Sequence, residues 1–188
     1  MALRPTASQT VGPFFIIGLP DGGRSELVPP SDPDAVRVGG VVLDGTGEPV
    51  DDALVEIWQA NRAGRYAHPE DTREELPVEE GFQGFGRCAT GPDGLYGFVT
   101  VKPGPVPAPD GGMQAPHIAI SVFARGLLKR VATRVYFPDE TEANEADPVL
   151  SSIEDPAERS TLVATAEDGR LRFDIRLQGD GQTAFLDV

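Results

Sequence analysis

Short runs in which hydrophobic and polar residues alternate recur along the chain, and they predict β-strands. The clearest runs are residues 54–58, 117–123 and 170–177, where the alternation is that of a strand with one buried face. Further strands are expected at residues 36–43, 95–101 and 131–137, with a last extended segment at 183–186. The chain is also rich in glycine (22 residues) and proline (18 residues), which favours many short strands joined by turns.

Helical signals are few by comparison. One helix is expected to begin near Asp155, which can cap free backbone N–H groups, with Pro156 in the first turn, Glu158 at a capping-box spacing and a short body over residues 157–164. Residues 139–146 are predicted to form an acidic helical turn.

The remaining segments are irregular. Residues 59–90 are expected to form a long loop, and a loop of this length inside a compact domain is usually functional or part of an interface. The apolar patch 14–17 lies in an otherwise polar segment and is expected to pack onto another surface, either this domain or a partner. The fold class predicted is all-β: an antiparallel β-sandwich over residues 36–188, with an extended N-terminal arm over residues 1–35, long loops and one short helix.

Charge and composition narrow the possible partners. The net charge of −14 would repel phosphate backbones, so nucleic acid and anionic membranes are not expected as partners. The same negative charge means that a site for an anionic aromatic substrate needs local positive charge. The single cysteine, Cys88, excludes an internal disulfide framework and a cysteine-based zinc site. No apolar run approaches the roughly 20 residues of a membrane span, and the first ten residues lack a secretory signal, so a cytoplasmic protein is expected.

Candidate chemistry rests on few side chains. Only two histidines, His68 and His117, are present, so metal binding would need oxygen ligands, which the tyrosines Tyr66, Tyr96 and Tyr136 could supply. Phenolate oxygen suits Fe(III) rather than zinc. Neither histidine lies in a recognisable nucleophile context, and no phosphate-binding loop is present. Taken alone, a strand histidine is more often a hydrogen-bonded core residue, and a loop tyrosine more often packs.

An ordered set of motifs changes that interpretation. Residues 55–61 read VEIWQAN and are followed by GRY at 64–66, and this stretch resembles the intradiol ring-cleaving dioxygenases, which open catechols with a mononuclear non-haem Fe(III). Further matches follow in order at residues 84–87 (GFGR), 100–105 (TVKPGP) and 115–118 (APHI). The resemblance extends from SQTVGPF at 8–14 to RFDIRLQG at 172–179 and covers nearly the whole chain.

The resemblance implies an incomplete metal site. Catalytic members bind iron through two tyrosines and a His-x-His pair, and Tyr66 and His117 occupy one position of each kind. The second tyrosine is replaced by Val106, the second histidine by Ala119, and an arginine that precedes the histidine pair by Gln114. Valine and alanine carry no donor atoms, so losing two ligands should weaken metal binding far beyond the roughly 10–100-fold typical of a supporting residue. No catalytic residue and no bound metal are therefore predicted in this chain, and Tyr66 and His117 are expected to be vestigial.

This combination resembles the non-iron-binding alpha subunit of two-subunit members of the family. The resemblance implies a homologous beta subunit that carries Fe(III), with an active site at the contact between the two subunits. Thr10, Gly12 and Pro13 in the arm, and Arg125 after a strand, are the residues expected to form part of its wall. The alternatives are that the Gly12–Pro13 pair only turns the arm and that Arg125 is a solvated cation at a strand end.

The function implied is to complete the active site of that partner, which would cleave protocatechuate with O₂ to 3-carboxy-cis,cis-muconate. Two alternatives stay open. One is a self-sufficient intradiol dioxygenase with an atypical iron site built from Tyr66, His117 and His68 or acidic residues. The other is a β-sandwich binding module without redox activity.

Overall fold

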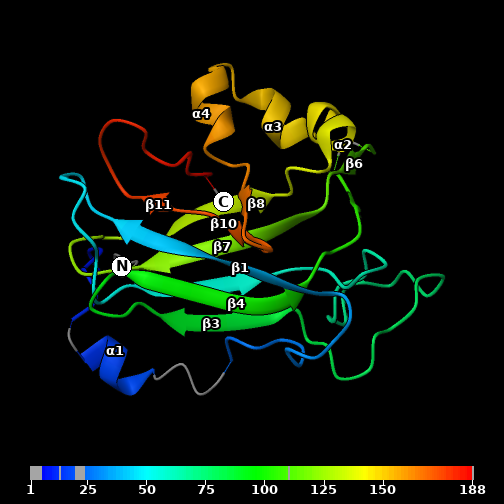
Figure 1. The fold of residues 1–188 in the computed structure, drawn as a ribbon, viewed down its shortest axis with the longest axis horizontal. Coiled ribbons are helices and arrows are strands. Elements are labelled where there is room, and N and C mark those ends of the chain that lie inside the picture. Colours follow the sequence, from blue (N-terminus) through cyan, green and yellow to red (C-terminus); the bar gives the residue numbers. More distant parts are fainter. Residues whose placement is uncertain (1–5, 13, 20–23, 110, 188) are drawn as a thin grey trace, which may run out of the picture.

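The computed structural model describes residues 6–12, 14–19, 24–109 and 111–187. Two β-sheets pack face to face, and α2–α4 gather along one edge of the molecule while α1 lies on the opposite edge (Figure 1). The all-β sandwich predicted from the alternating runs is confirmed. Within the described ranges, no helix is long and apolar enough to cross a membrane.

The first sheet is centred on β1 (Ala35–Leu43), which pairs antiparallel with β4 (Leu95–Val101). On its other side β1 pairs in parallel with β10 (Arg170–Arg172) and β11 (Ile175–Arg176), and β9 (Thr165–Glu167) extends the sheet beyond β10.

The single strand predicted at 170–177 is wrong in one respect, because the chain breaks between β10 and β11. At the break, the Asp174 carboxylate accepts a hydrogen bond from the Val41 N–H (3.0 Å), so a side chain takes the N–H that a strand carbonyl would otherwise bond.

The second sheet is fully antiparallel, in the order β3 (Phe85–Ala89), β2 (Leu54–Trp58), β7 (His117–Phe123) and β8 (Val131–Tyr136). A short ribbon of β5 (Val106–Pro107) and β6 (Met113–Gln114) precedes β7 in the sequence.

Strand β3 corrects the prediction that all of residues 59–90 form a loop. Its glycine-rich sequence hides the strand, and Gly86 is required there because a Cβ atom would lie 2.7 Å from Leu27 and 2.9 Å from Ile57.

The core lies between the two sheets, where apolar side chains from alternate positions of each strand meet. Val38 and Phe98 face inward from the first sheet, and Ile57, Ile118 and Ile120 face them from the second. Each of these strands therefore turns its other side chains outward. On the second sheet, that outward face carries the candidate site.

The described residues form four short helices: α1 (Phe14–Gly18), α2 (Thr141–Ala146), α3 (Pro148–Ser152) and α4 (Pro156–Ser160). The sequence predicted one helix, which is α4, and an acidic helical turn at 139–146, which α2 confirms. Asp155 caps α4 as predicted, accepting a hydrogen bond from the Ala157 N–H (2.9 Å). The helix ends before residue 164, because the Leu162 carbonyl accepts from the Tyr136 N–H at the end of β8.

The segment 183–186 is extended but is not a strand. It is held to β8 by a hydrogen bond from the Thr133 hydroxyl to the Ala184 carbonyl and by one from the Leu186 N–H to the Ala132 carbonyl.

The division into an arm (residues 1–35) and a domain (residues 36–188) stays a prediction. The chain just before β1 runs along β4, where the Leu27 N–H donates to the Val99 carbonyl (2.8 Å) and the Val99 N–H donates to the Ser25 carbonyl (2.9 Å). Val28 is buried.

Candidate functional site

The outer face of the second sheet carries an open cavity of about 660 Å³, which we name the Tyr66 pocket. Its wall includes Trp58 at the end of β2, Tyr66 in the following loop, and Val106 and Gln114 from the β5–β6 ribbon. Cross-strand pairing places Ala119 between Trp58 and Arg134, and pairs His117 with Tyr136. The cavity wall therefore includes three of the five positions that the sequence assigned to the vestigial iron site, while Ala119 and His117 lie on the neighbouring strand β7.

Tyr66 is held in place by its ring and by its backbone. Its ring stacks on Trp58 with 5.8 Å between centroids and 9° between planes, and its N–H donates to the Asp71 carboxylate (2.7 Å). Asp71 in turn pairs with Arg73 (2.6 Å). Burial raises the pKa of Tyr66 above its ordinary value of 10.0, so the side chain is a neutral phenol at pH 7.

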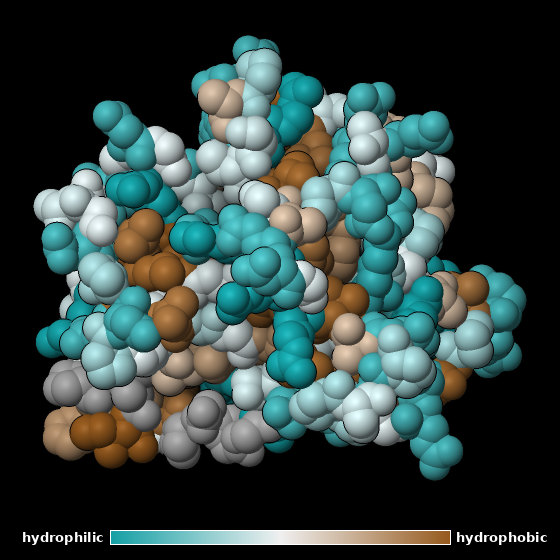
Figure 2. Space-filling model, in the orientation of Figure 1, coloured by the Kyte–Doolittle hydropathy of each residue, from teal (hydrophilic) through white to brown (hydrophobic). Residues whose placement is uncertain are grey.

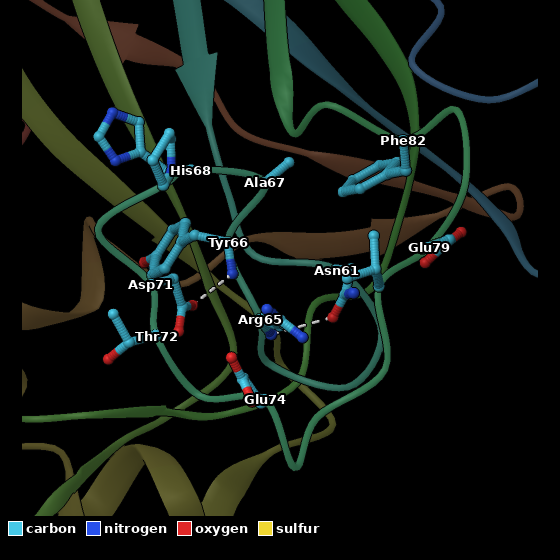
Figure 3. Close-up of a pocket in the computed structure, with 12 residues that line it drawn as sticks. Asn61, Arg65, Tyr66, Ala67, His68, Asp71, Thr72, Glu74, Glu79 and Phe82 are labelled. Carbon is cyan, nitrogen blue, oxygen red and sulfur yellow. Dashed lines mark hydrogen bonds between the residues drawn. The ribbon is translucent and has the colours of Figure 1, made fainter.

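The loop that carries Tyr66 has its own supporting bonds. Figure 3 shows a smaller cavity of about 390 Å³ beside this loop, with dashed lines from the Tyr66 N–H to Asp71 and from the Arg65 N–H to the Asn61 side chain. Gly64 lies at φ +83°, and a Cβ atom there would meet the Pro105 carbonyl oxygen at 2.2 Å. Glycine therefore lets the loop approach the segment that carries Val106.

His117 is the first residue of β7 and is only 6% exposed. Its Nδ1 atom is 2.8 Å from the Ala115 carbonyl oxygen, so this nitrogen carries the proton and donates. Burial, assisted by the nearby positive charge of Arg134, lowers the pKa of His117 from 6.5 to about 4. The imidazole is neutral at pH 7, and its ring packs on Tyr136 with 5.6 Å between centroids.

We expect His117 to make the stability of the fold depend on pH. Between pH 6.5 and about 4 the unfolded chain binds a proton at this residue and the folded chain does not, so the free energy of unfolding should fall by about 3 kcal/mol as the pH drops through this window. Urea unfolding of His117→Gln should lack this component of the slope. His68→Gln is the control, because His68 is exposed, and it should retain the full slope. Equal slopes in all three proteins would contradict this assignment.

Two residues of the site were missed by the sequence analysis. Asp147 is fully buried and accepts hydrogen bonds from the Tyr136 hydroxyl (3.1 Å), the Ala115 N–H (2.8 Å) and two N–H groups at the start of α3. Its position before Pro148 is a helix-capping signal that could have been noticed. No local sequence pattern marks Arg134, because its role depends on which residue of the neighbouring strand lies opposite it.

The donor atoms of the pocket do not fit a four-ligand ferric site. Val106 and Ala119 offer only carbon, so Tyr66 and His117 are the two of the four ligand positions that carry donor atoms. His68 is exposed and lies against Glu70, with its ring edge-on to Trp58. In the part of the chain that the structure describes, no three His, Cys, Asp or Glu side chains are grouped as metal ligands would be.

The predicted wall residues lie elsewhere, at the opposite end of β7. The Gly126 N–H donates to the Thr10 hydroxyl (2.7 Å), and the ring of Phe15 packs on Phe123 with 5.5 Å between centroids. Thr10 and Arg125 are thus brought together in a cluster that we name the Thr10–Arg125 corner. The corner lies about 20 Å from His117, the length of β7.

The remaining predicted wall residues differ in their surroundings. Gly12 is exposed, with no atom within 4 Å of where its Cβ would be, and Pro13 lies outside the described residues. The Arg125 side chain is 61% exposed and pairs with Asp52, with Asp51 at 4.0 Å. Arg125 thus has a partner within the chain and also faces solvent.

Comparisons with known proteins show the family of the chain. A family model described as dioxygenase matches residues 26–179. The chain is 44% identical to the protocatechuate 3,4-dioxygenase alpha chain of Burkholderia cepacia, covering 99% of this chain and 98% of that protein. It is 42% identical to the Pseudomonas putida alpha chain (98% and 97% covered) and 37% identical to the B. cepacia beta chain (80% and 67% covered).

A solved structure is also similar. It is the dioxygenase domain of a dioxygenase carbohydrate-binding protein fusion from Streptomyces sp. SirexAA-E, with a TM-score of 0.57 and 29% identity. The match covers 94% of this chain and 99% of that one.

Proposed function

The chain belongs to the intradiol dioxygenase family, and from this premise we propose that it is the alpha subunit of a protocatechuate 3,4-dioxygenase, completing an active site whose Fe(III) is held by a homologous beta subunit. The substrates of the assembly are protocatechuate and O₂, and the product is 3-carboxy-cis,cis-muconate. The complex works in the cytoplasm.

The observation that carries the proposal is the chemistry of the Tyr66 pocket. A cavity lies beside Tyr66, and Val106 and Ala119 present no donor atom to a metal. An enzyme that acted alone would need those donors, so ring cleavage is assigned to a partner chain. The similarity to both alpha and beta chains supports a pair of homologous subunits.

The Thr10–Arg125 corner supports a shared site. It lies too far along β7 to serve the chain's own pocket, so its residues are available to a neighbouring subunit. Thr10 fixes the arm through its bond with the Gly126 N–H, and Gly12 and Pro13 extend the wall that faces the partner. Arg125 supplies positive charge in a chain of net charge −14, and that charge can draw in the substrate carboxylate.

An exposed apolar surface lies next to this corner. Phe14 and Ile17 of α1 are 80% and 71% exposed, and Leu128, three residues after Arg125, is 62% exposed. Figure 2 shows hydrophobic surface at the lower left, where α1 lies in Figure 1. Large apolar side chains held in water mark an interaction surface. The beta subunit is the occupant proposed, and covering this surface would exclude water from the shared site.

In the shared site, the Fe(III) of the beta subunit would bind the catechol and activate it toward O₂. This chain would contribute binding and orientation: the arm forms a wall beside the ring, and the Arg125 guanidinium directs the carboxylate. No proton transfer is assigned to this chain, because His117 lies at the far end of β7 from the Thr10–Arg125 corner.

Co-expression with an iron-bearing beta-type chain tests the proposal. The two chains should purify together, and the complex should consume O₂ when protocatechuate is added, while this chain alone should not. The beta chain alone is the control and should be far less active than the complex. Stable association without any effect on activity would contradict a site-completing role, and failure to associate would favour the β-sandwich binding module.

A further inference from the structure

Arg134 lies beside the Tyr66 pocket, on the strand next to the missing histidine, and contacts the pocket wall through Gln114. It lies on β8 directly opposite Ala119, with Trp58 on the other side of Ala119. A methyl group fills little of the space that an imidazole would take, so the neighbouring side chains can extend over it. Arg134 is partly buried, as expected for a long side chain that lies across the sheet rather than out in solvent.

The guanidinium of Arg134 contacts Gln114, which replaces the family arginine, and Tyr136, the cross-strand neighbour of His117. One nitrogen, Nη1, donates to the Gln114 side-chain oxygen (2.6 Å) and lies 3.4 Å from the Tyr136 hydroxyl oxygen. Its charge lowers the pKa of Tyr66 and Tyr136, against a larger rise caused by burial. It also lowers the pKa of His117, in the same direction as the larger effect of burial. The Arg134 cation therefore lies near both vestigial ligands and bonds the residue that replaces the family arginine.

No carboxylate among the described residues neutralises this cation. The ion pairs found there do not include Arg134, and the buried Asp147 is engaged by the Tyr136 hydroxyl and three backbone N–H groups. Arg134 lies near Tyr66, Tyr136, His117 and Gln114, which are uncharged at pH 7, while the Asp147 carboxylate lies behind Tyr136 and is bonded to its hydroxyl. Among the charged residues that line the pocket, Arg73 is paired with Asp71 and Glu70 is almost fully exposed, so Arg134 is a cation beside the pocket with no ion-pair partner among the described residues.

We propose that the Arg134 guanidinium occupies the electrostatic place of the iron in this chain and excludes metal cations from the Tyr66 pocket. Like charges a few ångströms apart in a partly desolvated site repel strongly, and the arginine cannot lose its proton to relieve that repulsion. The lost ligands and the resident cation therefore act together. This inference rests on the proposed function only in taking the chain as the subunit without iron.

The simpler interpretation is that Arg134 is a strand residue that only packs and donates to Gln114. The two interpretations differ in what happens when metal ligands are supplied. If packing is its only role, restoring the ligands should create an iron site whether or not Arg134 is present. If its charge excludes metal, the restored ligands should bind iron only after the charge is removed.

The experiment restores both ligands as Val106→Tyr/Ala119→His in the full chain and varies residue 134. With Arg134 kept, or replaced as Arg134→Lys, Fe(III) bound per chain should stay near background. With Arg134→Met, which keeps the length and apolar stem of the side chain, bound Fe(III) should rise about tenfold or more, with a visible tyrosinate-to-iron band. Equal iron contents with and without the Arg134→Met substitution, whether both high or both low, would overturn the proposal.

A second measurement guards against variants that do not fold. In the otherwise unaltered chain, Ga³⁺ can be titrated against Arg134→Met and Arg134→Lys while the fluorescence of Trp58, the single tryptophan, is followed. Trp58 stacks on Tyr66, so it reports on the pocket directly. Ga³⁺ should bind about tenfold more tightly to Arg134→Met than to Arg134→Lys, and equal affinities would contradict the proposal. Neither assay involves the beta subunit, so a failure here is distinct from a failure of subunit assembly or of ring cleavage.

Discussion

Replacing Asp147 by alanine is expected to destabilise the fold by about 3–5 kcal/mol, the largest effect on stability at a single site that we predict. Asp147 is fully buried, and its carboxylate accepts hydrogen bonds from the Tyr136 hydroxyl, the Ala115 N–H and the N–H groups of Val149 and Leu150. The alanine variant would leave these donors without a partner inside the protein. Urea unfolding at pH 7 measures the loss.

A matched variant separates this network from simple helix capping. Asp155→Ala removes the cap of α4, which is exposed and accepts from the Ala157 N–H, so it should cost only about 1 kcal/mol. Asp147→Asn keeps one side-chain oxygen and should fall between the two. If Asp147→Ala cost no more than Asp155→Ala, the buried network would not be an important source of stability.

Replacing Arg125 by glutamate is expected to raise the KM of the alpha–beta complex for protocatechuate about tenfold or more, with a smaller change in kcat. The substitution removes a cation from the Thr10–Arg125 corner and places a carboxylate there, next to Asp52. A substrate that carries a carboxylate would then meet repulsion at the entrance to the shared site. Steady-state O₂ uptake at varied protocatechuate concentration measures the effect.

Lys129→Glu is the control for the change in overall charge. Lys129 is an exposed cation four residues away, and its reversal changes the net charge of the chain by the same amount. Its effect on KM should therefore be small and should vanish at high salt. An unaltered KM in Arg125→Glu, or an equal rise in both variants, would remove Arg125 from the site.

Most of the sandwich could be predicted because its strands bury one face and so alternate in sequence. The prediction failed where a glycine interrupted the alternating pattern of a strand, or where a side chain took the place of a backbone carbonyl as hydrogen-bond acceptor. Strand β3 was missed because Gly86 must be small to pack under Leu27, and the break before β11 depends on the Asp174 carboxylate, which bonds the backbone of another strand. Neither contact can be seen in the local sequence.

The candidate site was also predicted only in part from the sequence. The positions of Tyr66, Val106 and Gln114 around one cavity followed from a resemblance that spans the chain, and the structure places them together. Arg134 was missed because its importance comes from lying opposite Ala119 in the sheet, a relation set by strand register. The bond between Thr10 and the residue after Arg125 likewise joins positions 116 residues apart in the sequence.

This chain lacks the donor atoms to hold iron, and we propose that it completes a site in another subunit. Elemental analysis can measure the iron content of the purified full chain after expression in iron-replete medium without a beta subunit. We expect a colourless protein with almost no bound iron. One tightly bound Fe(III) per chain, with the colour of a tyrosinate complex, would contradict it.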